Sequence, residues 1–373
     1  MFLLQEEEEL GSHLIKCLYY ETTRLLARAA ENPDDITVLL TAPTGVAAFN
    51  INGLTIHSAL GIYKNLSPEH AVLGEDRINT LRSKLENLQI LIIDEVSMVS
   101  KRLLFFIHER LRQVKKVSEN NLFGGVSITA VGDFHQLPPV KAKASDKLYV
   151  NDPSSPVNHL WNELFSVVQL DQVMRQRYDT VLAELLNRLR IRQKNESIHQ
   201  NDMQALKQCM TDGPDDALHI FPTNSEVETY NSEMIMKLSS DKHLVEAEDF
   251  EKIKTSGKLV KRKSHFSDSS ILLPPSILLA EGARIMLTKN IDTEDGLVNG
   301  VMGTIASISL SSSNSLPNNV FVHFDNSKVR TNAKCKKTIN GIICIGLEPS
   351  SEDIPIKNEK GVSLTASLGL YCS

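Results

Sequence analysis

The sequence predicts an α/β protein whose first part is built on a parallel sheet covered on both faces. Three short apolar runs, at residues 37–41, 90–93 and 127–131, are typical of buried strands. Segments with helical periodicity alternate with them, over 12–30, from Pro43 onward and over 97–115. Strands that alternate with helices form parallel sheets, and their strands are apolar throughout because both faces are buried.

The same pattern restarts after a Lys-, Asp-, Ser- and Pro-rich segment at 141–157, which we expect to be a surface loop. A second α/β unit follows, with strands at 167–170 and 219–221 and helices at 180–192 and 225–238. From Ala283 the chain becomes β-rich, and short strands at 283–288, 303–308 and 320–324 suggest a small barrel-like module. We therefore expect domain boundaries at 165/166 and 282/283.

Composition excludes several classes of protein. No apolar run approaches the roughly 20 residues that a membrane span needs, so we expect no membrane partner. Glu6 to Glu9 make the start acidic, unlike a secretory signal or a transit peptide. The five scattered cysteines indicate free thiols in a reducing compartment. The net charge of −6 shows no basic excess, although an acidic protein can still carry a local basic groove for nucleic acid.

Two carboxylates, Asp94 and Glu95, follow the apolar run 90–93. The carboxyl edge of a parallel sheet is where α/β proteins bind ligands. In nucleotide hydrolysis the first carboxylate would hold magnesium, and the second would orient and deprotonate the attacking water. The alternative is a pair of acidic residues that caps the helix starting near Ser97.

An eight-residue string from Gly132 to Pro139 (GDFHQLPP) follows the next strand. The glycine permits a sharp turn, and the prolines stiffen the exit of the loop. Gln136 can both donate and accept hydrogen bonds, which suits a sensor of a terminal phosphate or its water. The alternative is an ordinary turn with Gln136 on the surface.

A third segment, TAPTGVAA from Thr41, places a helix start just past a strand. Free backbone N–H groups at such an end can bind a nucleic-acid phosphate. Here the candidate DNA-binding residues are Pro43, Thr44, Gly45, Asn50 and His57. The alternative is a helix start that serves packing, with His57 satisfied in the core.

Together these strings resemble the motifs of the PIF-type DNA helicases, a superfamily-one branch that moves 5′ to 3′ on single-stranded DNA. The resemblance continues through Met174-Arg175-Gln176, and it implies that Arg175 is the finger reaching the γ-phosphate. The segments GARIMLTKN and LVNGVMG, from Gly282 and Leu297, resemble the family's penultimate motif, which places Lys289, Asn290 and Asn299 near the DNA.

The resemblance implies two RecA-like parallel-sheet lobes of the P-loop NTPase type, with a small SH3-like β-barrel insert in the second lobe. The first lobe would span 1–165, the start of the second 166–282, and the insert region with a truncated second lobe 283–373. ATP and magnesium are the implied cofactors, with Asp94, Glu95, Gln136 and Arg175 as catalytic residues. Ser12 and Asp94 would hold the magnesium.

The sequence departs from the family at its phosphate-binding loop. Such a loop needs Gly-x-x-x-x-Gly-Lys-Ser/Thr. Counting back from Ser12-His13-Leu14-Ile15-Lys16, the glycines belong at 5 and 10 and the lysine at 11, but the chain has Gln5, Leu10 and Gly11. Four glutamates stand where triphosphate oxygens would lie, which is repulsive. The family's last motif finds no match either, so we expect an incomplete or degraded copy.

We therefore expect an ATP-dependent 5′-to-3′ DNA helicase by descent, acting in DNA repair, recombination and telomere maintenance. The alternative is an ATPase-dead pseudoenzyme or fragment that binds single-stranded DNA without unwinding it. The expected partners are single-stranded and fork DNA, the expected state is a monomer, and the expected location is the nucleus, with the mitochondrion as the alternative.

Overall fold

The computed structural model supports a description of most of the chain. The described residues are 2–5, 8–28, 32, 34–63, 72–117, 120–140, 142–152, 158–170, 180–193, 195–210, 217–252, 259–261, 276–288, 290–292, 295–310, 316–326, 329, 335–349, 351–355, 363–367 and 371–372. No helix among them is long and apolar enough to cross a membrane.

Internal contacts divide the chain into two compact units, Met1–Pro214 and Asp215–Ser373. The sequence places a boundary at 165/166 instead, between the two expected lobes. The difference arises at strand β6 (Ser166–Gln169), which pairs in parallel with β1 (Phe2–Gln5) and so belongs to the first sheet. Helices α7 (Thr180–Ile191) and α8 (Gln200–Gln208) also fall in the first unit.

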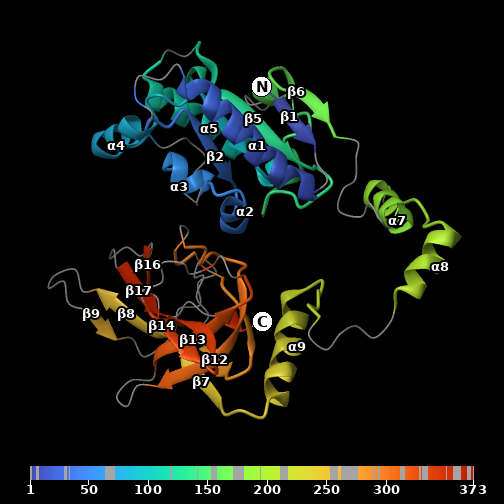
Figure 1. The fold of residues 1–373 in the computed structure, drawn as a ribbon, viewed down its shortest axis with the longest axis vertical. Helices are drawn as coiled ribbons and strands as arrows, with labels where there is room; N and C mark the ends of the chain where they lie inside the picture. Colours follow the sequence, from blue (N-terminus) through green and yellow to red (C-terminus); the bar gives the residue numbers. More distant parts are fainter. Residues whose placement is uncertain are drawn as a thin grey trace. The chain divides into compact units, whose positions relative to one another are not determined.

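The first unit contains a six-stranded sheet in the spatial order β3-β2-β4-β5-β1-β6, with every pairing parallel (Figure 1). The remaining strands are Leu54–Thr55 (β3), Val38–Ala42 (β2), Ile90–Ile93 (β4) and Ser127–Gly132 (β5). The parallel sheet and three of its predicted strands are thereby confirmed, each within one residue of its predicted bounds.

Alternation along the strands divides the sheet's two faces. Leu39, Leu91 and Ile93 pack with helices on one face, and Leu40 and Ile92 pack on the other. The first face is covered by α3 (Ile56–Leu60), α4 (Glu75–Leu85), α5 (Lys101–Lys115) and α6 (Asn158–Asn162). Because both faces are buried, these strands read as continuous apolar runs in the sequence.

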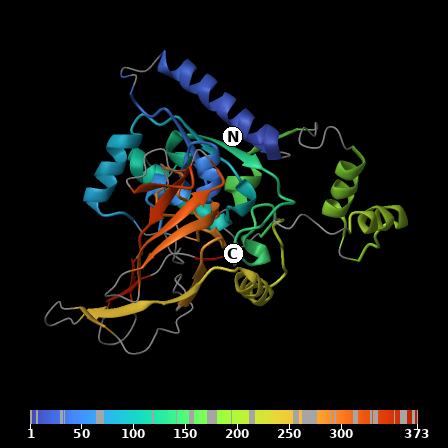
Figure 2. The same cartoon turned by 60° about the horizontal axis from the view of Figure 1, so that its bottom comes forward.

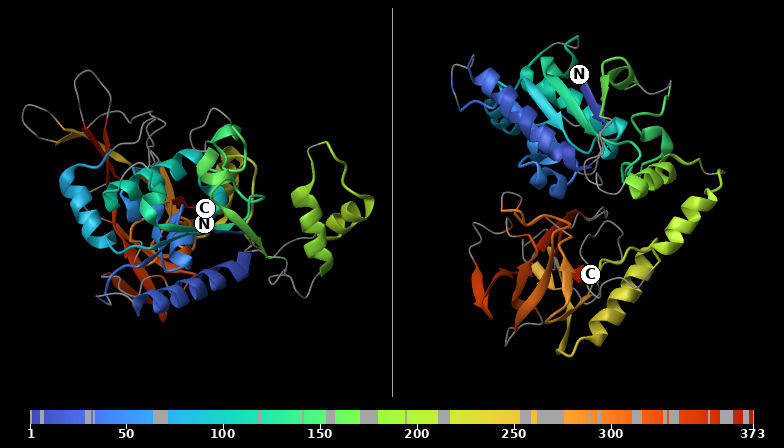
Figure 3. Two further views of the ribbon diagram at one scale, coloured as in Figure 1. Left: turned by 90° about the horizontal axis from the view of Figure 1, so that it is seen from above. Right: turned by 45° about the vertical axis from the view of Figure 1, so that its right-hand side comes forward.

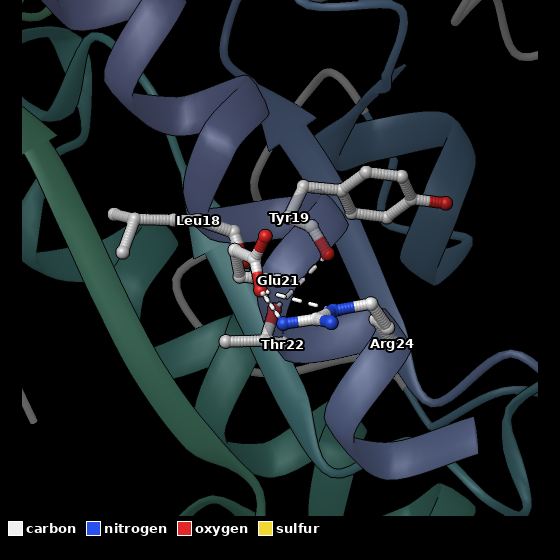
Figure 4. Close-up of polar contacts among 5 residues, drawn as sticks. All are labelled: Leu18, Tyr19, Glu21, Thr22 and Arg24. Atoms are coloured by element: carbon white, nitrogen blue, oxygen red, sulfur yellow. Dashed lines mark hydrogen bonds and ion pairs between the residues drawn. The ribbon is translucent and has the colours of Figure 1, made fainter. Parts of the chain in front are cut away.

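Helix α1 (Glu8–Ala27) lies across the other face, as Figure 3 shows, with Ile15 fully buried against the sheet. Polar contacts lie on its outer side. Arg24 donates to Glu21 through Nε and Nη2, and the Thr22 hydroxyl donates to the carbonyls of Leu18 and Tyr19 (Figure 4). Helix α2 (Gly45–Asn50) packs on the same side as α1.

The second unit begins with α9 (Asn224–Lys237), whose start is closed by reciprocal bonds between Thr223 and Glu226. Every described strand pairing that follows is antiparallel, and β12 and β13 run side by side at its centre (Figure 2). The strands are Lys242–Glu246 (β7), Glu248–Lys252 (β8), Leu259–Lys261 (β9), Ser276–Ala280 (β10), Arg284–Met286 (β11), Met302–Leu310 (β12), Pro317–Phe324 (β13), Lys336–Ile339 (β14), Ile342–Leu347 (β15), Ser351–Pro355 (β16), Ser363–Ser367 (β17) and Tyr371–Cys372 (β18).

Of two expectations for the later part of the chain, one is not confirmed and one is wrong. The barrel-like module is not confirmed, because the described strands pair in the order β14-β15-β13-β12-β11-β18, with separate β10-β7 and β16-β17-β8-β9 sheets. The predicted strand at 219–221 is not a strand, and Ile220 is 89% exposed. An apolar run becomes a strand only where a neighbouring strand accepts its backbone hydrogen bonds. The described residues of 166–282 therefore show no second parallel sheet.

Candidate functional site

The carboxyl edge of the parallel sheet carries the first predicted pair of carboxylates. Asp94 is buried at the end of β4, where its Oδ1 accepts a 2.8 Å hydrogen bond from the backbone N–H of Glu95. Its own N–H donates to the carbonyl of Thr41 on β2. Burial raises the pKa of Asp94 to about 6, and the bond from Glu95 offsets this only in part. A buried carboxyl of this kind gains most from a nearby cation.

Glu95 adopts a left-handed backbone conformation, with φ 50° and ψ 47°, directly before the short 3₁₀ helix Val96–Met98. A non-glycine residue rarely occupies this region, and such strain concentrates at functional sites. The turn gives the two neighbouring carboxylates different surroundings: Asp94 is buried, and Glu95 is half-buried.

The Gly132–Gln136 turn follows β5, the strand next to β4. Gly132 has φ 145°, and a Cβ there would lie 2.9 Å from the backbone nitrogen of Val96. The two turns therefore touch at this glycine. Asp133 organises its own turn, because its Oδ1 accepts from the N–H of His135 (2.9 Å) and its carbonyl accepts from the N–H of Gln136 (3.0 Å). Glu95 and Gln136 thus lie on adjoining turns, and Gln136 is half-buried.

Sequence reasoning did not identify Arg190, the residue whose side chain pairs with Asp133 in this turn. Asp133 is 1% exposed, and its Oδ2 accepts a 2.5 Å hydrogen bond from Nη1 of Arg190 on α7. The two residues are 57 positions apart, and nothing in either local sequence indicates the pairing.

The strand–helix junction at β1 is where the phosphate-binding loop of such a site would lie. Strand β1 ends at Gln5 and α1 begins at Glu8, so two residues, both glutamates outside the described range, connect them. Ser12 is the fifth residue of α1. A phosphate loop needs a glycine-rich segment of several residues and a lysine before the helix. The residues present at this junction do not fit the triphosphate of ATP.

Magnesium would need ligands at this sheet edge besides the protein's own side chains. Among the described residues no group of three or more His, Cys, Asp and Glu side chains could hold a metal. Magnesium commonly takes one or two carboxylates and fills its other positions with water and phosphate oxygens. Asp94 could contribute one such ligand, and Ser12, for which only the helical backbone is described, stays a prediction.

The predicted DNA-binding segment forms two short capped helices. The Thr44 hydroxyl accepts from the N–H of Ala47 (3.3 Å) at α2, and the Thr55 hydroxyl accepts from Ser58 (3.2 Å) at α3. These bonds occupy some of the amides that were expected to face a phosphate. Of the predicted contacts, Gly45 is buried, whereas the others differ in exposure: Pro43, Thr44 and His57 are half-buried and Asn50 is exposed.

In the second unit the structure brings two predicted DNA contacts together. The Asn290 side-chain Oδ1 accepts a 2.8 Å hydrogen bond from the N–H of Asn299. The loop between them is closed by a 2.8 Å bond from the N–H of Ile291 to the carbonyl of Leu297. Arg175 and Lys289 lie outside the described residues, so their roles stay predictions.

Comparisons with known proteins agree with these features. The PIF1-like helicase model matches residues 22–198, and the model of the Pif1 DNA helicase 2B domain matches 270–308. The chain is 32% identical to the ATP-dependent DNA helicase PIF1 of Emericella nidulans over 293 residues, which is 76% of this chain and 36% of the relative. It is 31% identical to the Saccharomyces cerevisiae helicase of that name over 280 residues, 72% of this chain and 30% of the relative.

Solved structures show the same fold. The structure of Bacteroides Pif1 bound to single-stranded DNA matches the whole chain and 78% of its own, with a TM-score of 0.67 at 20% identity. The Candida albicans Pif1 structure matches with a TM-score of 0.63 at 20% identity and covers 80% of its own chain. The chain spans about a third of the length of the curated relatives named above. The chain is therefore related to the PIF1-like helicases, through the model match over residues 22–198 and through its identity to these relatives over more than two thirds of its own length.

Proposed function

We propose that the protein acts on DNA, with ATP-dependent 5′-to-3′ unwinding as the activity of its family's motor, in repair, recombination and telomere maintenance. We further propose that the chain described here keeps the DNA-binding part of that activity and lacks nucleotide turnover. The single observation that carries this is the contrast at one sheet edge. The turns bearing Glu95 and Gln136 adjoin at Gly132, whereas two glutamates replace a phosphate loop between β1 and α1.

In this proposal the chain's own residues have separate roles in catalysis and in DNA binding. Glu95 is the candidate base for an attacking water, and Gln136 is placed on the adjoining turn to orient it. In the first unit, single-stranded DNA or the single strand of a fork would contact the segment that contains α2 and α3. The Asn290–Asn299 loop is a separate candidate contact, in the second unit. Relatives support this substrate, because Bacteroides Pif1 is solved with single-stranded DNA.

A titration of fluorescent oligothymidine tests the DNA-binding half. We expect binding that weakens steeply with salt, with a slope of roughly −0.7 per neutralised phosphate, and that does not respond to magnesium and ATP. Asn50→Ala should weaken binding. A matched control is Asn121→Ala, because Asn121 is also exposed but precedes β5, at the opposite edge of the sheet. Equal affinity for both variants would remove Asn50 from the interface.

Nucleotide turnover is tested in the chain as it stands and in a version with residues 5–11 rebuilt as a glycine-rich, lysine-bearing loop. We expect DNA-stimulated ATP hydrolysis only in the rebuilt chain, and its loss with Glu95→Gln. Hydrolysis by the original chain that Glu95→Gln abolishes would overturn the proposal that turnover is absent.

We also propose that the protein is a monomer, which sedimentation would test. We propose a nuclear rather than a mitochondrial location, which imaging of a fluorescent fusion would test.

A further inference from the structure

Asp133 is enclosed so completely that its charge requires a partner. It is 1% exposed, its Oδ1 is used by the His135 N–H, and its Oδ2 is used by Arg190 at 2.5 Å. A buried carboxylate is costly unless it is both paired with a cation and hydrogen-bonded. Arg190 supplies the cation from the last turn of α7, and its own side chain stays 32% exposed.

Arg188 and Arg192, the neighbouring arginines of this helical segment, form pairs with residues of α8 and of the segment before it. Arg188 binds Asp202 through Nε (3.1 Å) and Nη2 (2.7 Å), which joins α7 to α8. Arg192 donates to the carbonyl of Glu196, four residues on. The Arg190 bond is different in kind, because it connects α7 to a turn at the edge of the parallel sheet.

The Gly132–Gln136 turn is in close contact with the turn that carries Asp94 and Glu95. Gly132 precedes Asp133 and leaves no room for a Cβ against the Val96 nitrogen. The Gln136 N–H is held by the Asp133 carbonyl. A change in the position of Asp133 would therefore move Gln136 and press on the segment that follows Glu95.

We propose that Arg190 is a positioning residue for the Gln136 turn, and that its ion pair with Asp133 couples the placement of α7 to the shape of that turn. With the pair formed, α7 is docked and the Gln136 turn is held closed against Val96. With the pair broken, α7 is released and the turn loses the charge that balances Asp133. The inference rests on the proposed function only for what Gln136 does, since the coupling itself needs neither ATP nor DNA.

The test uses two native exposed cysteines, Cys17 on α1 and Cys209 at the end of α8. Both are spin-labelled in the full chain after the other three cysteines are replaced by alanine. We expect a narrow distance distribution in the parent, and with Arg190→Gln a rise of about tenfold in the population outside it. This is less than breaking a fully buried pair would give, because the Arg190 side chain is 32% exposed. Arg192→Gln is the matched control, and it should leave the distribution unchanged. An unchanged distribution with Arg190→Gln would overturn the docking of α7.

Amide hydrogen exchange separates positioning of the turn from docking of the helix. Arg190→Gln should accelerate exchange at His135 and Gln136 about tenfold, because an unbalanced charge is left in the turn. Asp133→Asn keeps the oxygen that His135 uses, so it should release α7 while leaving the His135 amide protected. If Arg190→Gln releases α7 but leaves both amides unchanged, Arg190 anchors the helix and does not position the turn.

One further variant tests the charge balance, and a second keeps the test decisive if Arg190→Gln folds poorly. Asp133→Asn with Arg190→Gln removes both charges, so its His135 exchange should be slower than in Arg190→Gln alone. Arg190→Lys keeps the positive charge with a single donor group, and it should restore most of the narrow distance distribution. Equal exchange in the single Arg190→Gln and the double variant would contradict the charge-balance argument.

Discussion

Replacing Gly132 with alanine tests how closely the two turns at the sheet edge fit together. Gly132 has φ 145°, where an L-residue is strained by about 1–3 kcal/mol. The new Cβ would also lie 2.9 Å from the Val96 nitrogen and 3.3 Å from its Cγ1, so one of the two turns must shift. Overpacking of this kind costs about 1–3 kcal/mol. We therefore expect Gly132→Ala to lower the free energy of unfolding of the first unit by about 2–6 kcal/mol.

The assay is urea unfolding followed by the fluorescence of Trp161, the protein's one tryptophan. Trp161 is a suitable reporter because it is buried and its ring packs 5.6 Å from Phe134, two residues after the substitution. Gly125→Ala is the matched control. Gly125 also has a positive φ, 80°, but no atom lies within 4 Å of its Cβ. The control should cost only the strain of the backbone, about 1–2 kcal/mol. If Gly132→Ala costs no more than Gly125→Ala, the turns do not fit as argued.

Further predictions concern a buried acid, a surface ion pair and a glycine of the second unit. Burial raises the pKa of Asp94 from its ordinary 3.8 to about 6, so the folded state binds more protons than the unfolded state between these values. Stability should therefore fall as pH rises through this window. Asp94→Asn should raise the free energy of unfolding at pH 7 by about 1–3 kcal/mol and change it little below pH 4, measured by urea unfolding at a series of pH values; an equal effect at both ends would contradict this assignment. The Arg284–Asp325 pair, 2.6 Å between Nη2 and Oδ2, lowers the pKa of Asp325 but is nearly half-exposed, so Arg284→Gln should cost at most about 1 kcal/mol, and less in high salt. Thermal unfolding of the Arg284→Gln variant measures this, and a larger loss of stability would contradict the prediction. Gly303→Ala places a Cβ 2.6 Å from the His323 carbonyl oxygen in the β12–β13 pair. The free energy of unfolding, followed by circular dichroism, should fall by at least about 2 kcal/mol. Stability equal to that of the wild type would show that β12 can move away.

The sequence by itself determined three strands of the parallel sheet and the sheet edge at which Asp94, Glu95 and Gln136 lie. Buried parallel strands are apolar throughout, so the runs at β2, β4 and β5 were visible without any partner in view. Because parallel strands end at a common edge, the residues after β4 and β5 had to lie near one another. The adjoining turns of Glu95 and Gln136 follow from that geometry.

Tertiary structure alone decided which strands pair and which distant side chains meet. Short strands are predicted at both 167–170 and 219–221, yet residues 166–169 pair with β1 and residues 219–221 form no strand. Each backbone N–H and C=O needs a partner, and local sequence does not say whether one is available. The Asp133–Arg190 pair has the same origin. A buried carboxylate requires a cation, but only the tertiary placement of α7, which brings the Arg190 side chain to Asp133, decides that the cation is Arg190.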